Sequence, residues 1–576
     1  MVGTEEHNKR KKRTAREQSL LRFILVAAAL VLININSSFV FKRFDLTADK
    51  RYTLNETSKT FLKELDDMVY IKVYLKGKFP PGFERLSNAT RELLDEMRIY
   101  AGDNLQYEFI DPSENENEKE RNQFYQQLAE QGLQPTNLES KEDGGTSQTI
   151  IFPGCIVSSA GREFPLMLLK DQLGVAPEQM LNNSVQGLEY ELINTVKKLR
   201  SPIPPSIAFL KGHGELLPIE MADLGKNLAE SYEIKFVEIA EQLNSLNDYN
   251  LVIVSRPLQA FSEKDKYILD QFIMNGGRVL WLLDMMNASM DSLRNSSETY
   301  ALYNDINLED MLFRYGARIN PDLILDLQSV PIPLVTGYIG NQPKQSLMPW
   351  YFYPMVSPVN DHPIVKNINS VWYRFCSSID TVGSAEIKKT VLLKTSPYTK
   401  LLPTPVRINL NILRDKPDPS QYNQGGQFVA VLLEGSFTSN FKNRLVEEMA
   451  LNPELGFKEQ GTYSKMVVVS DGDIAKNDVK ENSNSILPLG YDRYTNTVYG
   501  NKTFLMNIID YLTDDSNLIS LRTKDFKLRL LDNAKVNSSA STYKLLNVAG
   551  PLLLIILLGA YKNFRRKIKF AKKVNV

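Results

Sequence analysis

The chain has 576 residues, of which 43% are hydrophobic and 24% are charged. This length predicts two or three domains, and the two cysteines, Cys155 and Cys376, are too few for a disulfide scaffold or a thiolate metal site. The formal net charge is zero, but both ends are basic and the body between them is therefore acidic. An acidic body excludes duplex nucleic acid as a partner, because binding it requires clustered Lys and Arg.

The first apolar segment covers residues 23–41 and contains no charged side chain. Its sequence is FILVAAALVLININSSFVF, close to the roughly 20 residues that a helix needs to cross a bilayer core. A cleaved signal peptide is the alternative, but the segment ends in Phe39, Val40 and Phe41 rather than in small residues. We therefore predict an uncleaved transmembrane helix.

The second apolar segment, residues 545–561, reads LLNVAGPLLLIILLGAY and is also predicted to span the membrane. Pro551 is compatible with a span, because neighbouring groups in a membrane protein can satisfy the carbonyl that proline leaves free. A buried helix of a soluble domain is the alternative, but the cationic tail that follows favours the span.

Both ends of the chain carry basic tails. Residues 1–22 hold seven Lys or Arg against three Glu, and residues 562–576 hold seven Lys or Arg and no acid. Lys-rich and Arg-rich flanks stay on the cytoplasmic side of a membrane. We therefore predict that both tails are cytoplasmic and that the body between the spans lies on the opposite side.

Residues 44–200 are predicted to form a small α/β domain. Alternating apolar residues indicate strands, and apolar spacings of three and four indicate helices. The strands lie at 69–75, 105–110, 149–158 and 163–169, and the helices at 83–100, 118–131 and 186–199. A crossover pair followed by a hairpin at Ala160-Gly161 indicates a thioredoxin-like layout, but without a CxxC motif redox chemistry is excluded.

A proline-rich break at 201–206 precedes a central α/β domain, residues 207–520. Short apolar strands alternate there with helices, one of them capped by Ser262, which predicts a doubly wound parallel sheet covered on both faces. Residues 285–300 are predicted to be a loop, and the Pro-rich and aromatic stretch 328–425 allows no assignment. The predicted strands lie at 207–210, 234–239, 251–255, 278–284, 317–326, 428–433 and 466–470, and the helices at 218–231, 308–315 and 503–512.

The first candidate site is the sequence KGHGE directly after the first strand of the central domain. Ligands bind at the carboxyl ends of strands in parallel sheets, and His213 with Glu215 could contact a ligand, bind a metal or move a proton. A structural turn is the alternative. The sequence has no GxGxxG, Walker A or GxSxG motif around it.

The second candidate site is Asp471-Gly472-Asp473, which follows a late strand of the same domain. Two carboxylates could begin a calcium site, but the DxDxDG spacing is missing and a structural turn is the alternative. His213, Glu215, Asp471 and Asp473 are therefore the predicted ligand-binding residues. No catalytic residue, metal site or cofactor is predicted.

Several stretches in order along the chain carry a resemblance to a known family. They are RFDLTADKRYTLNETSKTFLKELDDMVYIKVYL after the first span, IAFLKGHGE, GGRVLWLLD, YGARINPDLILD, VVVSDGDI and GNKTFLMNIIDYL. With the two spans, this order resembles the auxiliary proteins of gliding-motility ABC transporters. No single stretch is specific; their order and the position of the spans carry the resemblance.

The resemblance implies a non-enzymatic accessory, substrate-binding-type subunit in a bacterial inner membrane, with a periplasmic body. Its partners would be a separate ABC permease and a separate ABC ATPase, and the solute stays unknown. The central domain would be similar to class I glutamine amidotransferases, with a flavodoxin-like sheet but without their cysteine nucleophile. A periplasmic scaffold without a small ligand and a hydrolase built on His213 and Glu215 are the alternative functions.

Overall fold

The computed structural model describes residues 22–31, 53–523 and 538–571, with short gaps. Contacts divide the chain into two compact units, Met1–Lys524 and Asp525–Val576, and each is described by itself. The predicted break at 201–206 lies partly outside the described residues. The gaps are 78, 143–144, 171–175, 201–203, 294–295, 341, 384, 415, 445–455, 481–484 and 517.

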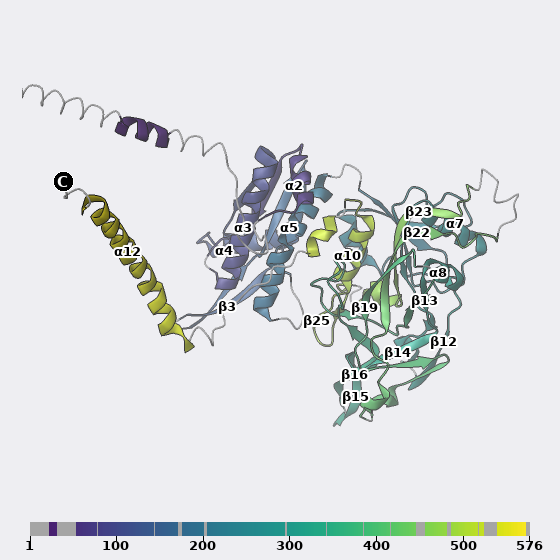
Figure 1. The fold of residues 1–576 in the computed structure, drawn as a ribbon. Coiled ribbons are helices and arrows are strands. Elements are labelled where there is room, and N and C mark those ends of the chain that lie inside the picture. Colours follow the sequence, from purple (N-terminus) through teal and green to yellow (C-terminus); the bar gives the residue numbers. More distant parts are fainter. Residues whose placement is uncertain are drawn as a thin grey trace, which may run out of the picture. The chain divides into compact units, whose positions relative to one another are not determined.

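Within the first unit, residues 53–200 keep the name N-terminal domain and residues 204–523 the name central domain; the N-terminal domain is purple to blue in Figure 1. It contains a four-stranded sheet in the order β2-β1-β5-β6. Strands β1 and β2 are parallel, whereas β5 is antiparallel to both β1 and β6. The crossover and the hairpin at Ala160-Gly161 are thus as predicted. The strands are β1 (Val69–Val73), β2 (Leu105–Phe109), β5 (Gly154–Ser159) and β6 (Arg162–Met167), and the helices are α2 (Glu56–Lys63), α3 (Pro81–Ala101), α4 (Glu118–Glu130) and α5 (Pro177–Arg200).

Helix α3 illustrates how the sequence determines the two ends and the buried face of a helix. Pro81 occupies the first helical position, where a missing N–H is harmless, and Gly102 follows the last turn with φ +60°. Between them, Leu86, Leu94 and Met97 lie on one side and are fully buried in the domain core.

One predicted strand of this domain was wrong. Residues 149–158 form the end of β4 (Gly145–Ile151) and most of β5, separated at Phe152-Pro153, where proline offers no N–H to the sheet. Strand β4 pairs with β3 (Thr136–Glu142), for which the sequence predicted no strand. Helix α5 also begins at Pro177, nine residues before the predicted start at 186.

The central domain is built on one large mixed sheet. Its parallel part has the order β8-β7-β9-β10-β23. Beyond β23 the sheet continues antiparallel through β22, so an entirely parallel sheet was a wrong prediction. The strands are β7 (Ser206–Lys211), β8 (Glu233–Glu238), β9 (Leu251–Ser255), β10 (Arg278–Leu282), β13 (Ala317–Ile319), β18 (Ile379–Thr381), β19 (Lys388–Lys394), β22 (Phe428–Thr438) and β23 (Gln460–Val469).

Both faces of this sheet are buried, as strand β9 shows. Leu251 and Ile253 join the core that contains residues of α6 (Ala222–Ala229) and α10 (Asn501–Thr513). Val252 and Val254 join the core of the opposite face, which contains residues of α7 (Glu263–Met274) and α8 (Glu309–Tyr315). A strand buried on both faces has a continuous apolar sequence, which is why the pattern predicted covered faces correctly.

Helix α7 begins as predicted. The Ser262 side chain accepts a hydrogen bond from the Asp265 N–H at 3.1 Å, and Ser262 has an extended backbone. This is the usual N-cap arrangement, in which a hydroxyl satisfies a free N–H of the first turn. Helix α6 is shorter than the predicted 218–231.

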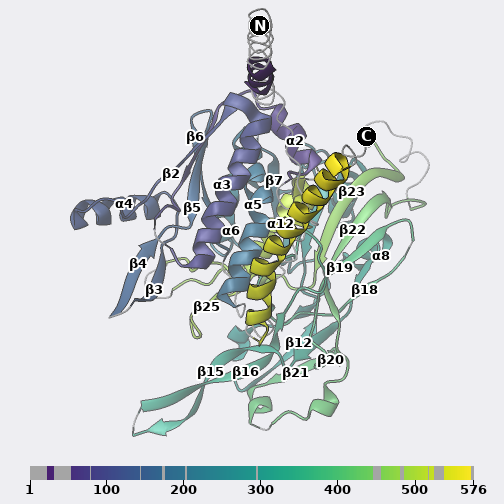
Figure 2. The same cartoon turned by 60° about the vertical axis from the view of Figure 1, so that its left-hand side comes forward.

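Residues 286–422 contain several small sheets that the sequence did not reveal (Figure 2). They share an aromatic core that includes Trp350, Phe352 and Phe375. Prolines at 331, 333, 343, 349 and 354 lie within the longest hairpin, so its sequence did not read as strands. The strands are β11 (Met286–Asn287), β12 (Glu298–Tyr303), β14 (Asp322–Asp326), β15 (Ser329–Ile339), β16 (Gln342–Val356), β17 (Val371–Trp372), β20 (Thr399–Pro403) and β21 (Val406–Asn409).

This region corrects two further predictions. The predicted loop at 285–300 contains β11 and the beginning of β12. The predicted strand at 317–326 divides into β13 and β14, which belong to different sheets, because Asn320-Pro321 interrupts it.

Both cysteines are buried and free. Cys155 lies on β5 of the N-terminal domain, and Cys376 lies between β17 and β18. Burial raises the pKa of the Cys155 thiol to about 12 and also raises the pKa of the Cys376 thiol. The two cysteines are in different parts of the fold and form no disulfide with each other.

The second unit contains α12 (Ala540–Ala571), which includes Pro551. Its segment Ala540–Ile568 is long and apolar enough to cross a membrane. It includes the whole predicted span 545–561. Near the other end of the chain, residues 23–31 of the first predicted span lie in the apolar helix Arg22–Val31, and residues 32–41 lie outside the described residues.

Candidate functional site

His213 lies in the loop after β7, between two glycines with positive φ. Gly212 has φ +117° and Gly214 has φ +77°, backbone conformations that favour glycine. The buried imidazole stacks on Phe261, with ring centroids 3.7 Å apart and an interplanar angle of 13°. The two glycines thus allow the loop to turn the histidine inward.

Both imidazole nitrogens of His213 contact carboxylates. Nδ1 lies 3.1 Å from Glu215 Oε1, and Nε2 lies 3.2 Å from Asp265 Oδ2. Burial alone lowers the pKa of His213, but Glu215 and Asp265 outweigh it and the pKa is raised. Asp265, in the first turn of α7, was not among the predicted site residues, so this partner was missed.

Asp471 and Asp473 follow β23 at the same carboxyl edge of the sheet. Asp471 is fully buried: Oδ2 accepts a hydrogen bond from the Arg374 N–H at 2.6 Å, and Oδ1 accepts one from the Asp473 N–H at 2.8 Å. The Gly472 N–H donates to Asp284 Oδ1 at 2.7 Å. The Asp471-Gly472-Asp473 motif therefore forms a turn whose backbone N–H groups donate hydrogen bonds to carboxylates.

Arg256, which follows β9, connects two carboxylates of this edge. Its Nε lies 3.4 Å from Asp284 Oδ2 and its Nη1 lies 3.3 Å from Asp473 Oδ1. Arg256 has φ +54°, which is uncommon for a residue with a side chain. A Cβ atom at Gly472 would lie 2.6 Å from the Arg256 side chain, so only glycine fits there without a shift.

Asp284, Asp471, Asp473 and Arg256 are named the carboxyl-edge cluster. Burial and the charge of Asp473 raise the pKa of Asp284 to about 7. Burial and the charges of Asp284 and Asp473 also raise the pKa of Asp471 well above its ordinary value. The cluster therefore holds a proton near neutral pH.

The four predicted site residues do not form one constellation. His213 and Glu215 lie after β7, whereas Asp471 and Asp473 lie after β23, with β9 and β10 between those strands. Among the described residues no hydrogen bond or ion pair joins the two pairs. Nor does the described part of the chain contain a group of three or more His, Cys, Asp or Glu arranged to hold a metal.

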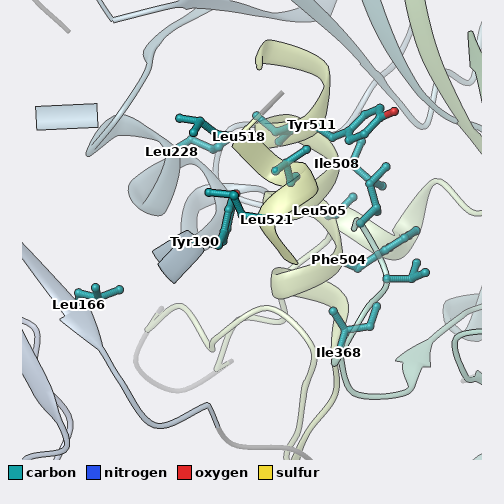
Figure 3. Packing of buried hydrophobic residues seen from close by; sticks show 14 of the residues in the cluster. Leu166, Tyr190, Leu228, Ile368, Phe504, Leu505, Ile508, Tyr511, Leu518 and Leu521 are labelled. Atoms are coloured by element: carbon teal, nitrogen blue, oxygen red, sulfur yellow. The ribbon is translucent and has the colours of Figure 1, made fainter. Parts of the chain in front are cut away.

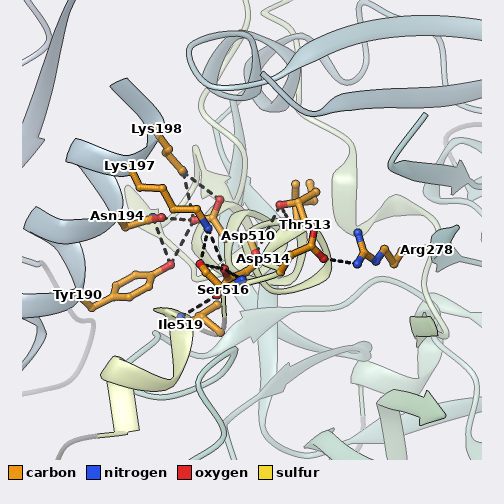
Figure 4. Close-up of polar contacts among 12 residues, drawn as sticks. Tyr190, Asn194, Lys197, Lys198, Arg278, Asp510, Thr513, Asp514, Ser516 and Ile519 are labelled. Atoms are coloured by element: carbon orange, nitrogen blue, oxygen red, sulfur yellow. Dashed lines mark hydrogen bonds and ion pairs between the residues drawn. The ribbon is translucent and has the colours of Figure 1, made fainter. Parts of the chain in front are cut away.

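A second polar cluster, which was not predicted from the sequence, joins the N-terminal and central domains (Figure 4). It is named the junction cluster. Asp510 on α10 receives hydrogen bonds from Lys198 Nζ at 2.9 Å and from the Tyr232 hydroxyl at 2.6 Å. The Tyr190 hydroxyl on α5 lies 3.4 Å away. Burial works against ionisation, but Lys198 and Tyr232 outweigh it and the pKa of Asp510 is lowered.

Asp514 extends this junction cluster by one helical turn. It accepts hydrogen bonds from Lys197 Nζ at 2.9 Å and from the Ile519 N–H at 3.0 Å. Ile519 lies in a short helix, η6 (Leu518–Thr523), whose Leu518 and Leu521 are buried in the same core as Tyr190 (Figure 3). The end of the central domain is thus fixed to α5 by both ion pairs and apolar packing.

The junction also forms a cleft of about 430 Å³. Its walls come from β6 and α5 of the N-terminal domain and from α6 and α10 of the central domain. Charged and amide side chains line it, among them Asn194, Lys198, Glu230, Asp510 and Arg522. Its volume falls within the range of ligand pockets, which often lie between domains.

These features define a class of protein: a multi-sheet α/β protein associated with a membrane through an apolar helix. The family model described as an ABC-type uncharacterized transport system, an auxiliary component, matches residues 204–508, which is more than half of the chain. The chain belongs to this family of transport accessory components. Residues 48–158 match a domain of unknown function.

Comparison with individual proteins adds no functional conclusion. No curated protein matches the chain. A solved structure described as "mmIFT52 N-terminal domain" is similar at 15% identity and a TM-score of 0.30, covering 54% of this chain and 98% of its own. A likeness at this TM-score carries no argument about fold or function.

Proposed function

We propose that the chain is a non-enzymatic, membrane-anchored accessory subunit, of the substrate-binding type, in an ABC transport system. The observation that carries this proposal is the family match over residues 204–508, together with the apolar helix Ala540–Ile568. The chain has no Walker A motif. A separate ATPase would therefore supply the energy and a separate permease would provide the path, and these are the proposed partners.

The proposed location is a bacterial inner membrane, with both termini cytoplasmic and the body periplasmic. The basic tails at both ends support this orientation. The role in gliding motility rests on the resemblance of the sequence stretches described above. Reporter fusions after Asp45 and before Tyr543 should both report the periplasm, and a cytoplasmic signal from either would contradict the orientation.

Two fold assignments belong to the same proposal. The parallel order β8-β7-β9-β10-β23 supports a doubly wound, flavodoxin-like and amidotransferase-like central sheet. The order β2-β1-β5-β6 supports a thioredoxin-like N-terminal domain. His213, Glu215, Asp471 and Asp473 stay proposed ligand contacts, although a ligand would compete there with hydrogen bonds inside the protein.

A periplasmic scaffold is the second candidate function. It is favoured by the hairpin of β15 and β16, where Val335, Tyr338 and Leu347 are 52%, 73% and 48% exposed. Exposed apolar side chains gathered on one element mark surfaces that bind other proteins. In this function the body would dock to envelope proteins and bind no small molecule.

Affinity purification of the tagged full-length chain from gently solubilised membranes separates the two functions. A permease and an ATPase in fixed ratio are expected with the accessory subunit. The matched control replaces residues 545–561 by an unrelated apolar span, which keeps the anchor but loses specific packing against a permease. Recovery of envelope structural proteins alone, with both variants, would favour the scaffold.

A further inference from the structure

Helix α12 continues as a helix well beyond its apolar part. It runs without a break through Ala540–Ala571 (Figure 1), whereas the predicted span ends at residue 561. At about 1.5 Å per residue, its 32 residues extend about 48 Å. The hydrocarbon core of a bilayer is only about 30 Å thick. A helix of this length that crosses the core therefore also extends into the polar layer of the membrane.

The first positions after residue 561 place three cations on one side of α12. Lys562, Arg565 and Arg566 are separated by three and four residues, so their side chains are neighbours on the helix surface. All three are exposed, and α12 contains no Asp or Glu that could neutralise them. Lys567 faces a different side of the helix. Lys562, Arg565 and Arg566 are named the basic stripe.

An apolar stripe runs along another side of the same helix end. Tyr561, Phe564 and Ile568 have the same spacing of three and four and are 60%, 65% and 49% exposed. A helix end with one cationic and one apolar side suits the boundary between headgroups and acyl chains. The apolar side chains can reach the acyl chains there, while the long cationic side chains extend among the headgroups.

The depth of the basic stripe distinguishes between lipid and soluble protein as its partner. From Lys562 to Arg566 the helix rises about 6 Å, and the polar layer of each leaflet is roughly 5–8 Å thick. The three cations therefore lie within the layer that contains the lipid phosphates. A soluble protein would have to enter that layer to reach them, so lipid phosphate is the favoured partner.

We propose that the basic stripe binds the phosphate groups of anionic phospholipids, so that α12 selects anionic lipid in the leaflet that surrounds its C-terminal end. Guanidinium groups donate paired hydrogen bonds to phosphate oxygens, and the ammonium group of Lys562 adds a point charge. This inference rests on the membrane anchoring that is part of the proposed function. It requires neither a solute nor a particular orientation of the body.

Native mass spectrometry of the full-length protein in a neutral detergent tests the proposal. The affinity is measured for phosphatidylglycerol and for phosphatidylcholine, two lipids that differ in headgroup charge. We expect the unmodified chain to bind phosphatidylglycerol at least about fivefold more tightly, the factor that corresponds to one cation close to an anionic headgroup. In the variant Lys562→Gln/Arg565→Gln/Arg566→Gln this preference should fall below about twofold.

The matched control removes the same number of charges from the same tail. Lys567→Gln/Lys572→Gln/Lys573→Gln leaves the basic stripe intact and should keep the preference for phosphatidylglycerol. Equal losses in the two triple variants would assign the effect to net charge and overturn the proposal. Glutamine is a good helix former, so neither variant should disturb the exposed helix end.

Glycerol 3-phosphate is the third probe, because it carries the phosphate without acyl chains. Displacement of phosphatidylglycerol by an equal concentration of it would show a site for free phosphate and would overturn the proposal.

Equal binding of the two lipids by the unmodified chain would overturn the proposal as well. If the basic-stripe variant then also lost a copurifying ATPase, the stripe would be assigned to an acidic protein surface. Release of the unmodified chain from membranes by alkaline carbonate would instead contradict the proposed anchoring. The anchoring and the lipid preference can therefore fail separately.

Discussion

The carboxyl-edge cluster and the junction cluster both contain aspartates shielded from water, but in opposite electrostatic states. At the edge, Asp284 and Asp471 face other carboxylates and their pKa values are raised. At the junction, Asp510 and Asp514 face lysines and their pKa values are lowered. Burial raises the pKa in all four cases, so the neighbouring charges and hydrogen-bond donors decide the outcome. In the carboxyl-edge cluster the carboxylates therefore repel one another. In the junction cluster, opposite charges stabilise the contact between the two domains.

The largest effect is expected for Asp510→Ala at the junction. This change leaves the half-buried Lys198 and the buried Tyr232 without their partner, and breaking a fully buried ion pair costs about 3–5 kcal/mol, which is the upper limit here. Denaturant unfolding of the full chain should show a fall of up to that size. The control is Asp66→Ala, whose carboxylate is 86% exposed beside Arg200 and should contribute less than about 1 kcal/mol.

The next largest effect is expected for the pH dependence of the free energy of unfolding, compared between the unmodified chain and Asp284→Asn. The folded pKa of about 7 lies above the unfolded value, so the contribution of the protonated group is present at low pH and is lost as the pH rises through 7. The free energy of unfolding of the unmodified chain should fall relative to the variant by about 1.4 kcal/mol per pH unit between roughly pH 4 and 7. Parallel curves for the two proteins would mean that Asp284 does not bind a proton in this pH range.

Gly472→Ala tests the edge cluster without changing its charge. The added methyl group would lie 2.6 Å from the Arg256 side chain and push it away from Asp284 and Asp473. We expect a loss of about 1–2 kcal/mol, typical of overpacking. Gly225→Ala is the control, since a Cβ atom at that glycine of α6 meets nothing within 4 Å. It should not lower the stability.

The smallest effect is expected for Lys197→Gln, the more exposed part of the junction. Lys197 is 35% exposed while its partner Asp514 is 8% exposed, and Asp514 keeps its hydrogen bond from the Ile519 N–H. The loss in the free energy of unfolding should be below about 1 kcal/mol. A loss as large as that of Asp510→Ala would mean that the two carboxylates act as one unit, which a double variant would reveal as non-additivity.

The sequence predicted the elements whose signals are local. Leu251 to Val254 read as a strand covered on both faces, and the Ser262 cap fixed the start of α7; the structure confirms both. The prolines of the β15 and β16 hairpin hid it, because proline normally argues against a strand. Periodicity also gave no sign that antiparallel strands would extend the sheet beyond β23.

The polar clusters were predictable only where they lie at strand ends. His213, Glu215, Asp471 and Asp473 were found by this rule, and Asp284 could have been found by it. Asp510 could not, because Lys198 lies 312 positions away in another domain and its helix carries no distinguishing motif. Contacts between residues far apart in the sequence depend on how the domains pack, and a single sequence does not show that packing.

The burial of both thiols has a practical meaning for experiments in living cells. Neither Cys155 nor Cys376 is accessible, and burial raises the pKa of both thiols, so neither forms the reactive thiolate at physiological pH. A cysteine introduced at an exposed position would thus be the reactive thiol in an otherwise natural chain. A membrane-impermeant maleimide could then map each side of the membrane without first removing the native cysteines.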